Sequence, residues 1–282
     1  MPATDYYIGR TVNQRWRPSA LIGVGGFGWV YSAIDLSSRH SSVVIKFAEA
    51  DTEEEFQVSL TCLRTEYECL RRLNRDVPHL RVPTVYEWGS YEDTDYLVMT
   101  RLGDSVESSL FARSRPASNY SILYTCNKVF NILRRLHERN VAHGDITLQN
   151  VVFGRSGDRD NLYVIDFGSS RPAHPDLVLD DVAELCHCMV LMFRNGVDGL
   201  VPENERGGLF FDSLTATQVQ MIRRNLDRAF EQRARQGTPI PREVATIVRT
   251  VMCGNGIDHS ELEGLFLRAL NGASTQSNAR TR

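Results

Sequence analysis

The sequence predicts an α+β fold of two lobes, in which a β-rich half is followed by a mostly helical half. Residues 20–50 alternate strand-like runs with turns rich in glycine and serine. From residue 120 onward, apolar side chains recur at helical spacing over several long segments. A chain of 282 residues that is 42% hydrophobic is long enough to bury both cores. We therefore expect a small lobe over residues 10–102 and a large lobe over 103–271.

The elements can be placed in order along the chain. Strands are expected over the runs ALI, WVYSAID, VVIKFA, VPTVYEWG and YLVMTRL. Apolar residues at 56, 60, 63, 67, 70 and 73 predict an amphipathic helix over 53–74. Further helices are expected over 121–139, 180–194, 215–236, 241–252 and 260–270, with a short β insertion near VVFG and LYVIDFG. Residues 1–9 are expected to form an N-terminal extension, and the polar residues 272–282 a disordered tail.

Charge and hydropathy exclude several classes of function. The net charge of −3 gives no general basic field for nucleic acid or an anionic membrane. No run approaches the roughly 18 apolar residues of a membrane span, and the amino terminus lacks the apolar core of a signal peptide. Six cysteines, mostly inside apolar segments, favour a reducing compartment, cytoplasmic or nuclear. Cys186-His187-Cys188 is expected in a buried helix rather than at a metal.

The glycines at 23, 25 and 28 match G-x-G-x-x-G, a pattern that both dinucleotide-binding folds and kinases use. A dinucleotide-binding fold needs a helix directly after the glycines, whereas here a β-rich run follows. In kinases the glycines form a hairpin whose backbone amides cover the phosphates of the nucleotide. A plain glycine-rich hairpin without a ligand is the third interpretation. The stretch expected to cover a nucleotide is Ile22, Gly23, Val24, Gly25, Gly26, Phe27, Gly28, Trp29 and Val30.

Lys46 and Glu66 both occupy positions where an apolar residue is expected. Of the 32 basic residues all but Lys46 and Lys128 are arginine, and Lys46 interrupts an apolar strand. Glu66 falls on the apolar stripe of its helix. Since a buried charge needs a partner, pairing the two satisfies both, with phosphate oxygens as further partners of the ammonium group. The alternative is a snorkelling surface lysine and a Glu66 in a frayed part of its helix.

The segment NVAHGDITLQNVVF contains Asp145 and Asn150, and Asp166 follows in YVIDFG. A carboxylate such as Asp145 can accept the proton of a reacting hydroxyl. Asn150 and Asp166 supply the oxygen ligands that Mg²⁺ prefers. Phosphoryl transfer needs little beyond such positioning and charge neutralisation. Either aspartate alone could be a turn or strand-end residue, but both at this spacing after a lysine predict transfer from ATP.

Taken in order, GVGGFGWVY, VVIKF, HGDITLQN and DFG resemble the eukaryotic protein kinases over about residues 10–271. The stretches QRWRPSALIGVGGFGWVY, VMTRLGDSVESSLF and EVATIVRTVMCGNGIDHSELEGLFLRAL are most similar to the casein kinase 1, tau-tubulin kinase and vaccinia-related kinase group. The resemblance implies a bilobal kinase fold with ATP and Mg²⁺ as cofactors. It also implies Met99 as gatekeeper, Thr100 to Leu102 as the adenine-binding hinge, and Asp181 as anchor of the central helix.

Three departures from that family pattern bear on activity. Gly144 replaces an arginine before the catalytic aspartate, which predicts no switch by activation-loop phosphorylation. Thr147 stands where serine/threonine kinases carry a lysine that contacts the transferred phosphate, which predicts slower turnover. Only twelve residues separate Gly168 from Asp181, with no A-P-E motif between them, so the peptide-docking segment is nearly absent.

The expected function is a serine/threonine protein kinase that uses Mg·ATP, with a protein substrate and a further protein partner completing the docking surface. No nucleic-acid or membrane partner is expected. Two alternatives stay open: a nucleotide-binding regulator or scaffold with little transfer activity, and a small-molecule phosphotransferase, since the short HGD-type loop also occurs there.

Overall fold

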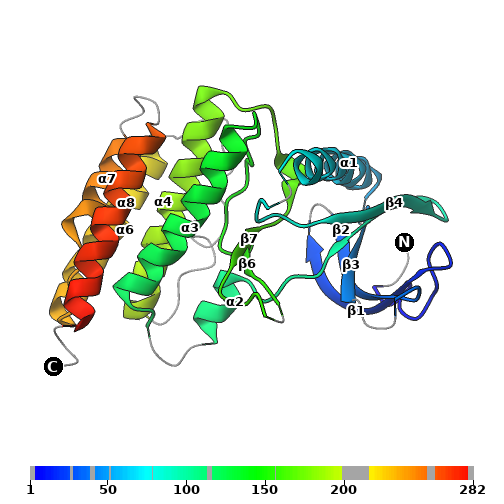
Figure 1. The fold of residues 1–282 in the computed structure, drawn as a ribbon, viewed down its shortest axis with the longest axis horizontal. Helices are drawn as coiled ribbons and strands as arrows, with labels where there is room; N and C mark the ends of the chain where they lie inside the picture. Colours follow the sequence, from blue (N-terminus) through cyan, green and yellow to red (C-terminus); the bar gives the residue numbers. More distant parts are fainter. Residues whose placement is uncertain are drawn as a thin grey trace. The chain divides into compact units, whose positions relative to one another are not determined.

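In the computed structural model, a β-rich part of the chain precedes a helical part, which confirms the predicted α+β class (Figure 1). The structure describes residues 4–25, 28–38, 42–50, 52–77, 79–112, 116–155, 157–198, 216–252 and 258–278. The first of two units comprises Met1–Gly103, Gly154–Arg159 and Ile165–Ser170. The second comprises Asp104–Phe153, Asp160–Val164 and Arg171–Arg282.

The first unit is built on a five-stranded antiparallel sheet with the strand order β1-β2-β3-β5-β4. Its strands are β1 (Trp16–Gly25), β2 (Gly28–Asp35), β3 (Ser42–Phe47), β4 (Val85–Tyr91) and β5 (Thr94–Thr100). The β1–β2 and β2–β3 pairs are hairpins, whereas β3 pairs with β5 only after the chain has passed through a helix and β4. The predicted strands are therefore present in the predicted order.

Aromatic residues on one face of this sheet form its core, and the chain before residue 10 contributes to it. Tyr7 is buried and stacks on Phe47, with ring centroids 3.8 Å apart and an interplanar angle of 8°. Its neighbours in the core include Trp16, Tyr31 and Tyr96. The segment before residue 10, predicted as an N-terminal extension, thus groups with the first unit through Tyr7.

Helix α1 (Glu53–Asp76) has a well-defined start. The Thr52 hydroxyl accepts a hydrogen bond from the Glu55 backbone N–H, and the Glu55 carboxylate accepts one from the Thr52 backbone N–H. This capping box satisfies two N–H groups that a helix start leaves without partners. The helix buries the stripe that its sequence periodicity predicts, including Leu63, Glu66 and Leu70.

The second unit is mainly helical. Its elements are α2 (Val106–Phe111), α3 (Asn119–His137), β6 (Val151–Phe153), β7 (Leu162–Val164), α4 (Pro175–Asp198), α6 (Ala216–Arg235), α7 (Arg242–Met252) and α8 (His259–Asn278). Helix α4 contacts α3, α6 and α7, and every residue from 180 to 194 is buried. A helix that is buried on all sides lies at the centre of its unit. The buried positions include Cys186, His187 and Cys188, as expected for that segment.

Several boundaries differ from the sequence-based expectation. Helix α4 begins at Pro175 rather than near 180, because proline is favourable at the first position of a helix. Helix α8 continues to Asn278, so residues 272–278 are helical rather than part of a disordered tail, and 279–282 lie outside the described residues. The short helix α2 was not predicted. Across the described residues, no helix combines the length and the apolar character that a membrane crossing requires.

Candidate active site

The first unit holds a buried cluster of one lysine and two carboxylates. Lys46, on β3, is only 4% exposed. Its Nζ lies 2.7 Å from Oε2 of Glu66, on α1, and 3.0 Å from Oδ1 of Asp166. The second Glu66 oxygen, Oε1, accepts a hydrogen bond from the Phe167 backbone N–H at 3.3 Å. The pairing of Lys46 with Glu66 that the sequence predicts is therefore present, and Asp166 joins it.

The two carboxylates keep the ammonium group of Lys46 charged. Burial acts to lower the pKa of Lys46, but the negative charges of Glu66 and Asp166 outweigh it and raise the pKa above its ordinary value. A charged lysine enclosed by the sheet and α1 can therefore exist without solvent. It presents a fixed positive charge beside Asp166, which is 24% exposed at its side chain. Such a charge is suited to binding phosphate oxygens.

The backbone at Asp166 is held in an unusual conformation. Asp166 has φ 64° and ψ 76°, in the left-handed region, directly before the short 3₁₀ helix η1 (Phe167–Ser169). For a residue other than glycine this conformation costs about 1–2 kcal/mol. The next glycine, Gly168, lies so close to α1 that an added Cβ would come within 3.2 Å of the Cys62 Cβ. A side chain at Gly168 would therefore crowd α1, which favours glycine at this position.

The β1–β2 hairpin brings the three pattern glycines together. Gly23 pairs with Val30, and Gly25 pairs with Gly28. Gly28 has φ +112°, and a Cβ at this position would lie 2.2 Å from the Phe47 carbonyl oxygen, so only glycine fits. Hence the hairpin, with a strand and no helix after its glycines, excludes the dinucleotide-binding geometry.

The side chains of the predicted nucleotide-covering stretch differ in their surroundings. Ile22 and Val24 on β1 are 50% and 60% exposed, whereas Trp29 is buried in the aromatic core and Val30 is half-buried. Gly26 and Phe27 lie outside the described residues. Trp29 can therefore take part in a nucleotide site only through its backbone.

The predicted gatekeeper and hinge residues lie at the end of β5. Met99 is buried and pairs with Val44 on β3. The Thr100 backbone N–H donates a hydrogen bond to the Thr84 carbonyl oxygen at 2.9 Å, and the Thr100 hydroxyl donates one to the same oxygen at 3.3 Å. Leu102 is half-buried just after the strand. The hinge assignment of Thr100 to Leu102 stays a prediction.

In the second unit, the loop after Ala142 carries Asp145 and Asn150. The Asn150 side-chain amide donates to the Asp145 carboxylate at 2.8 Å and to the Asp145 carbonyl oxygen at 3.0 Å. The Asn150 backbone N–H is 3.2 Å from the Thr147 hydroxyl. Since the Asn150 nitrogen is committed to Asp145, its carbonyl oxygen is the atom left to accept or to ligate. Asp145 and Asn150 are thus brought together as the spacing predicts.

Asp181, at 0% exposure on α4, holds the start of this loop. Its two carboxylate oxygens accept hydrogen bonds from the backbone N–H groups of His143 and Gly144, both at 2.8 Å, and one of them contacts His137 Nε2 at 2.8 Å. Gly144 has φ 79°, a conformation that glycine adopts without strain. The backbone thus gives a physical reason for glycine at a position where the resembling family carries arginine.

Glu184 is a second buried acid that contacts the same loop, one helical turn after Asp181. Its Oε2 accepts a hydrogen bond from the Ile146 backbone N–H at 2.7 Å. Burial raises the pKa of Glu184 to about 9, and the charges of Asp181, Asp145 and Asp180 add to the rise, while the Ile146 N–H opposes it. The sequence patterns did not point to Glu184. The available signal was Glu184 standing three residues after Asp181 at the start of the apolar run of α4.

Each unit by itself offers an oxygen donor of a type that Mg²⁺ accepts. Asp166 supplies a carboxylate and Asn150 an amide oxygen, and both atom types are ligands that Mg²⁺ accepts. These two residues belong to different units, Asp166 to the first and Asn150 to the second. The residues expected to carry the chemistry therefore form one cluster in each unit: Lys46, Glu66 and Asp166, and Asp145 with Asn150.

Comparison with known proteins places these residues inside a recognised domain. A family model for the protein kinase domain matches residues 16–184, a range that contains both clusters. The chain is 21% identical over 218 residues to the probable serine/threonine-protein kinase YbdM of Bacillus subtilis (strain 168), covering 74% of this chain and 80% of that protein.

Two viral kinases are also similar. The chain is 25% identical over 163 residues to the B1 kinase of vaccinia virus (strain Western Reserve), covering 55% of this chain and 52% of that protein. The B1 kinase of monkeypox virus matches at the same identity over 55% of this chain and 51% of its own length. Thus the chain spans about half the length of these viral relatives.

Proposed function

This chain belongs to the protein kinase domain family, and from that premise we propose that it transfers the γ-phosphate of Mg·ATP to a serine or threonine hydroxyl of a protein. The observation that carries the proposal is the buried contact of Lys46 with both Glu66 and Asp166. A scaffold has no need to bury a lysine between two carboxylates, whereas a site for ATP phosphates needs a fixed charge of this kind.

Each cluster has a distinct part in the proposed reaction. Lys46, held by Glu66, binds the phosphates of ATP through its ammonium group. Asp145 accepts the proton of the acceptor hydroxyl while the oxygen–phosphorus bond forms and the bond to the ADP leaving group breaks. Asn150 orients Asp145 through its amide nitrogen. Asp166 and the Asn150 oxygen would hold Mg²⁺, which neutralises phosphate charge when bound.

The closer relationship is also a proposal: that this kinase belongs with the casein kinase 1, tau-tubulin kinase and vaccinia-related kinase group. The stretches QRWRPSALIGVGGFGWVY and VMTRLGDSVESSLF support it, and the similarity to the two B1 kinases agrees with it. From the cysteine pattern we propose an intracellular location, cytoplasmic or nuclear.

A second function, a nucleotide-binding regulator with little transfer activity, is favoured by one feature. After η1, only residues 170–174 precede α4, so this part of the chain offers almost no segment on which a peptide could dock. If the protein is an active kinase, a protein partner must supply that surface. A small-molecule phosphotransferase would need no such partner.

The test is transfer of radiolabelled γ-phosphate by the purified protein and by Asp145→Asn, with casein, the protein itself and a lysate fraction as acceptors. We expect labelled protein from the wild type and a loss of about 100- to 10,000-fold in the variant. Since Asn150 can still hydrogen-bond to an asparagine, binding of Mg·ATP should survive the substitution. Binding of Mg·ATP without any label would instead support the regulator, and a labelled small molecule the third reading.

A further inference from the structure

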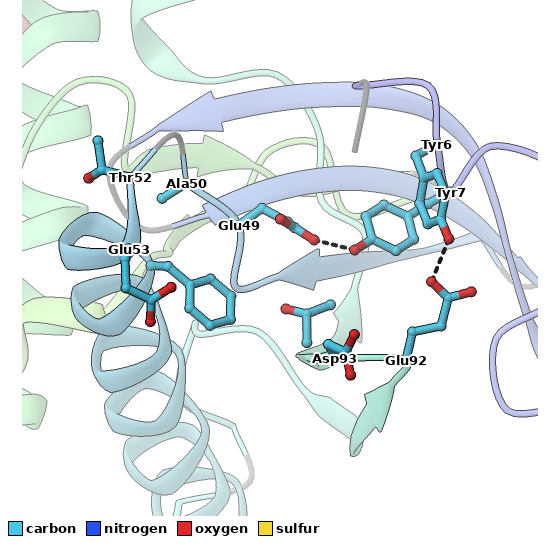
Figure 2. A pocket seen from close by; sticks show the side chains of 10 residues that line it. Tyr6, Tyr7, Glu49, Ala50, Thr52, Glu53, Glu92 and Asp93 are labelled. Atoms are coloured by element: carbon cyan, nitrogen blue, oxygen red, sulfur yellow. Dashed lines mark hydrogen bonds between the residues drawn. The ribbon is translucent and has the colours of Figure 1, made fainter. Parts of the chain in front are cut away.

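A cavity of about 510 Å³ lies in the first unit at the N-terminal end of α1 (Figure 2). It is lined by three groups of residues that are distant in sequence: the segment around Tyr7, the chain from Glu49 into α1, and the turn between β4 and β5. None of these residues belongs to the Lys46 cluster. A volume of this size is sufficient for a side chain and its neighbours or for a small ligand.

Aromatic rings supply the apolar part of the cavity. Tyr6 and Tyr7 meet edge to face, with ring centroids 5.1 Å apart, and Phe56 on α1 is half-buried at the lining. Tyr7 is fixed from behind, because it stacks on Phe47 in the sheet core. The Tyr7 ring is therefore held against the sheet, and aromatic faces of this kind attract cations.

Four carboxylates supply the polar part. Glu53 and Asp93 are exposed at the rim, and Glu92 is already in contact with Arg10, at 3.6 Å. Glu49 differs from them, since it is only 7% exposed and faces Tyr7, whose hydroxyl donates a hydrogen bond to it. Within the described part of the chain, no arginine, lysine or histidine forms an ion pair with Glu49.

Among the described residues, Glu49 accepts one side-chain hydrogen bond, from the neutral Tyr7 hydroxyl, and a buried carboxylate gains from a charged partner. A cation that enters the cavity would give Glu49 a charged partner, with Glu53 and Asp93 adding negative potential at the entrance. The planar guanidinium group suits this combination best, because it can bind a carboxylate with two donors and stack on a tyrosine ring.

We propose that this cavity is a docking site for a partner protein segment that inserts an arginine flanked by apolar residues. The arginine binds Glu49, and the apolar neighbours pack on Tyr6, Tyr7 and Phe56. This binding does not depend on the chemistry at Lys46.

Occupancy has an expected effect on α1. Thr52, Glu53 and Phe56 belong to the start of the helix whose Glu66 holds Lys46. A ligand that joins this start to the β4–β5 turn would stabilise the position of α1 and so increase phosphate transfer. This second part of the inference rests on the proposed function.

The probe is a set of fluorescein-labelled hexapeptides, each with one central arginine between varied apolar residues and none with a hydroxyl side chain. Each has a match in which citrulline replaces arginine and removes only the charge. We expect members of the set to bind wild type and Asp145→Asn alike, at least about tenfold more tightly than their citrulline matches. The polyamine spermidine serves as a cation without apolar side chains. If no peptide binds more tightly than its citrulline match, or if spermidine binds and no peptide does, the proposal is overturned.

Substitutions locate the binding. Glu49→Gln keeps an acceptor for the Tyr7 hydroxyl but removes the charge, and should weaken peptide binding about tenfold or more. Glu53→Gln should weaken it less. The matched control is Glu54→Gln, which removes the neighbouring charge of the same helical turn but lies outside the cavity lining. Equal losses in Glu54→Gln and Glu49→Gln would refute a site at Glu49.

Transfer of label is then measured with and without saturating peptide. A higher rate in wild type, absent in Glu49→Gln, supports the coupling to α1. Peptide binding with an unchanged rate keeps the docking site and rejects the coupling. Because binding is read by anisotropy in a variant designed to be inactive, a failure of the proposed kinase activity cannot be mistaken for a failure of the docking site.

Discussion

At the scale of single residues, Lys46 is the charge on which the first cluster depends. It is enclosed by Glu66 and Asp166, and the chain has only one other lysine, Lys128, whose ammonium group lies 5.2 Å from the centre of the Tyr124 ring. A buried ion pair that loses one partner leaves the other charge without compensation. Substitution of Lys46 should therefore affect both binding and stability.

We predict that Lys46→Met weakens Mg·ATP binding, lowers transfer at least about 100-fold and reduces the free energy of unfolding by about 3 kcal/mol. Calorimetric titration with Mg·ATP measures the binding, and urea denaturation measures the free energy of unfolding. Lys128→Met is the control, since it also removes one lysine but leaves Glu66 and Asp166 paired. Full activity of Lys46→Met would contradict the role of the pair.

Glu184 gives a prediction for pH. Its pKa is raised to about 9 in the folded protein, against an ordinary value near 4.5. Between these two values the folded state binds a proton at this position that the unfolded state releases, so stability falls as pH rises. The slope from this one group is at most about 1.4 kcal/mol per pH unit.

Glu184→Gln removes this titration but keeps an oxygen for the Ile146 N–H. We predict that the variant gains stability relative to wild type as pH is raised from 5 to 9 on the scale of about 1 kcal/mol per pH unit. Urea denaturation across the pH series measures the difference. A constant difference at all pH values would show that Glu184 is ionised in the folded protein.

The two clusters could be predicted from the sequence to different extents. Lys46 and Glu66 were found because each breaks an apolar pattern, and Asp145, Asn150 and Asp166 because oxygen-bearing residues follow buried runs. The supports behind them were harder to identify. His137 and Glu184 act through backbone N–H groups or through Asp181, and hydrogen bonds to the backbone leave no mark in the spacing of residue types.

At the scale of elements, α1 links the cluster to the sheet. Its first turn combines the Thr52 capping box with three glutamates, which interact favourably with the N-terminal end of the helix dipole. The same helix then presents Glu66, fourteen residues after Thr52, to Lys46. The stability of the helix start thus contributes to the position of a site residue.

Thr52→Ala should lower the free energy of unfolding by about 1 kcal/mol, because it removes the hydroxyl that caps the Glu55 N–H. Thr52→Ser, which keeps the hydroxyl, should lie within a few tenths of a kcal/mol of wild type. Urea denaturation followed by tryptophan fluorescence measures both. Equal losses in the two variants would indicate that the methyl group of Thr52, rather than the cap, is what matters.

At the scale of the whole molecule, the chain provides a natural reporter for the first unit. Its three tryptophans, Trp16, Trp29 and Trp88, all lie within Met1–Gly103, whereas most helices belong to the second unit. Tryptophan fluorescence therefore follows the unfolding of the first unit, and far-ultraviolet circular dichroism is dominated by the second. The two signals need not coincide, because a chain of two units is not bound to unfold in one step.

We predict that Mg·ATP at a hundred times its Kd raises the free energy of unfolding, followed by tryptophan fluorescence, by about 2.7 kcal/mol. Asp145→Asn should retain this stabilisation and Lys46→Met should lose it. Removal of the metal with EDTA should abolish most of the effect, since Asp166 and Asn150 are proposed to bind the nucleotide through Mg²⁺. The same stabilisation by ATP in EDTA would argue against a metal at these residues.

The sequence by itself determined the order of the elements, the α+β class and the identities of the residues with a chemical reason to be buried. Those features follow from local periodicity and from single polar residues in apolar runs, which need no knowledge of distant contacts. The boundaries of the elements were predicted less accurately, as α4 and α8 show, because the ends of helices depend on the residues against which they pack.

Only the tertiary structure decided which distant residues meet. Tyr7 joins the sheet core, Asp166 joins Lys46 across 120 residues, and Glu184 reaches the loop of Asp145 from another helix. The cavity at Glu49 has the same origin, since it combines three segments that share no pattern. Such contacts form when side chains from several distant segments are buried together. The free energy gained depends on all of these segments at once, so it is a property of the folded chain rather than of any one segment.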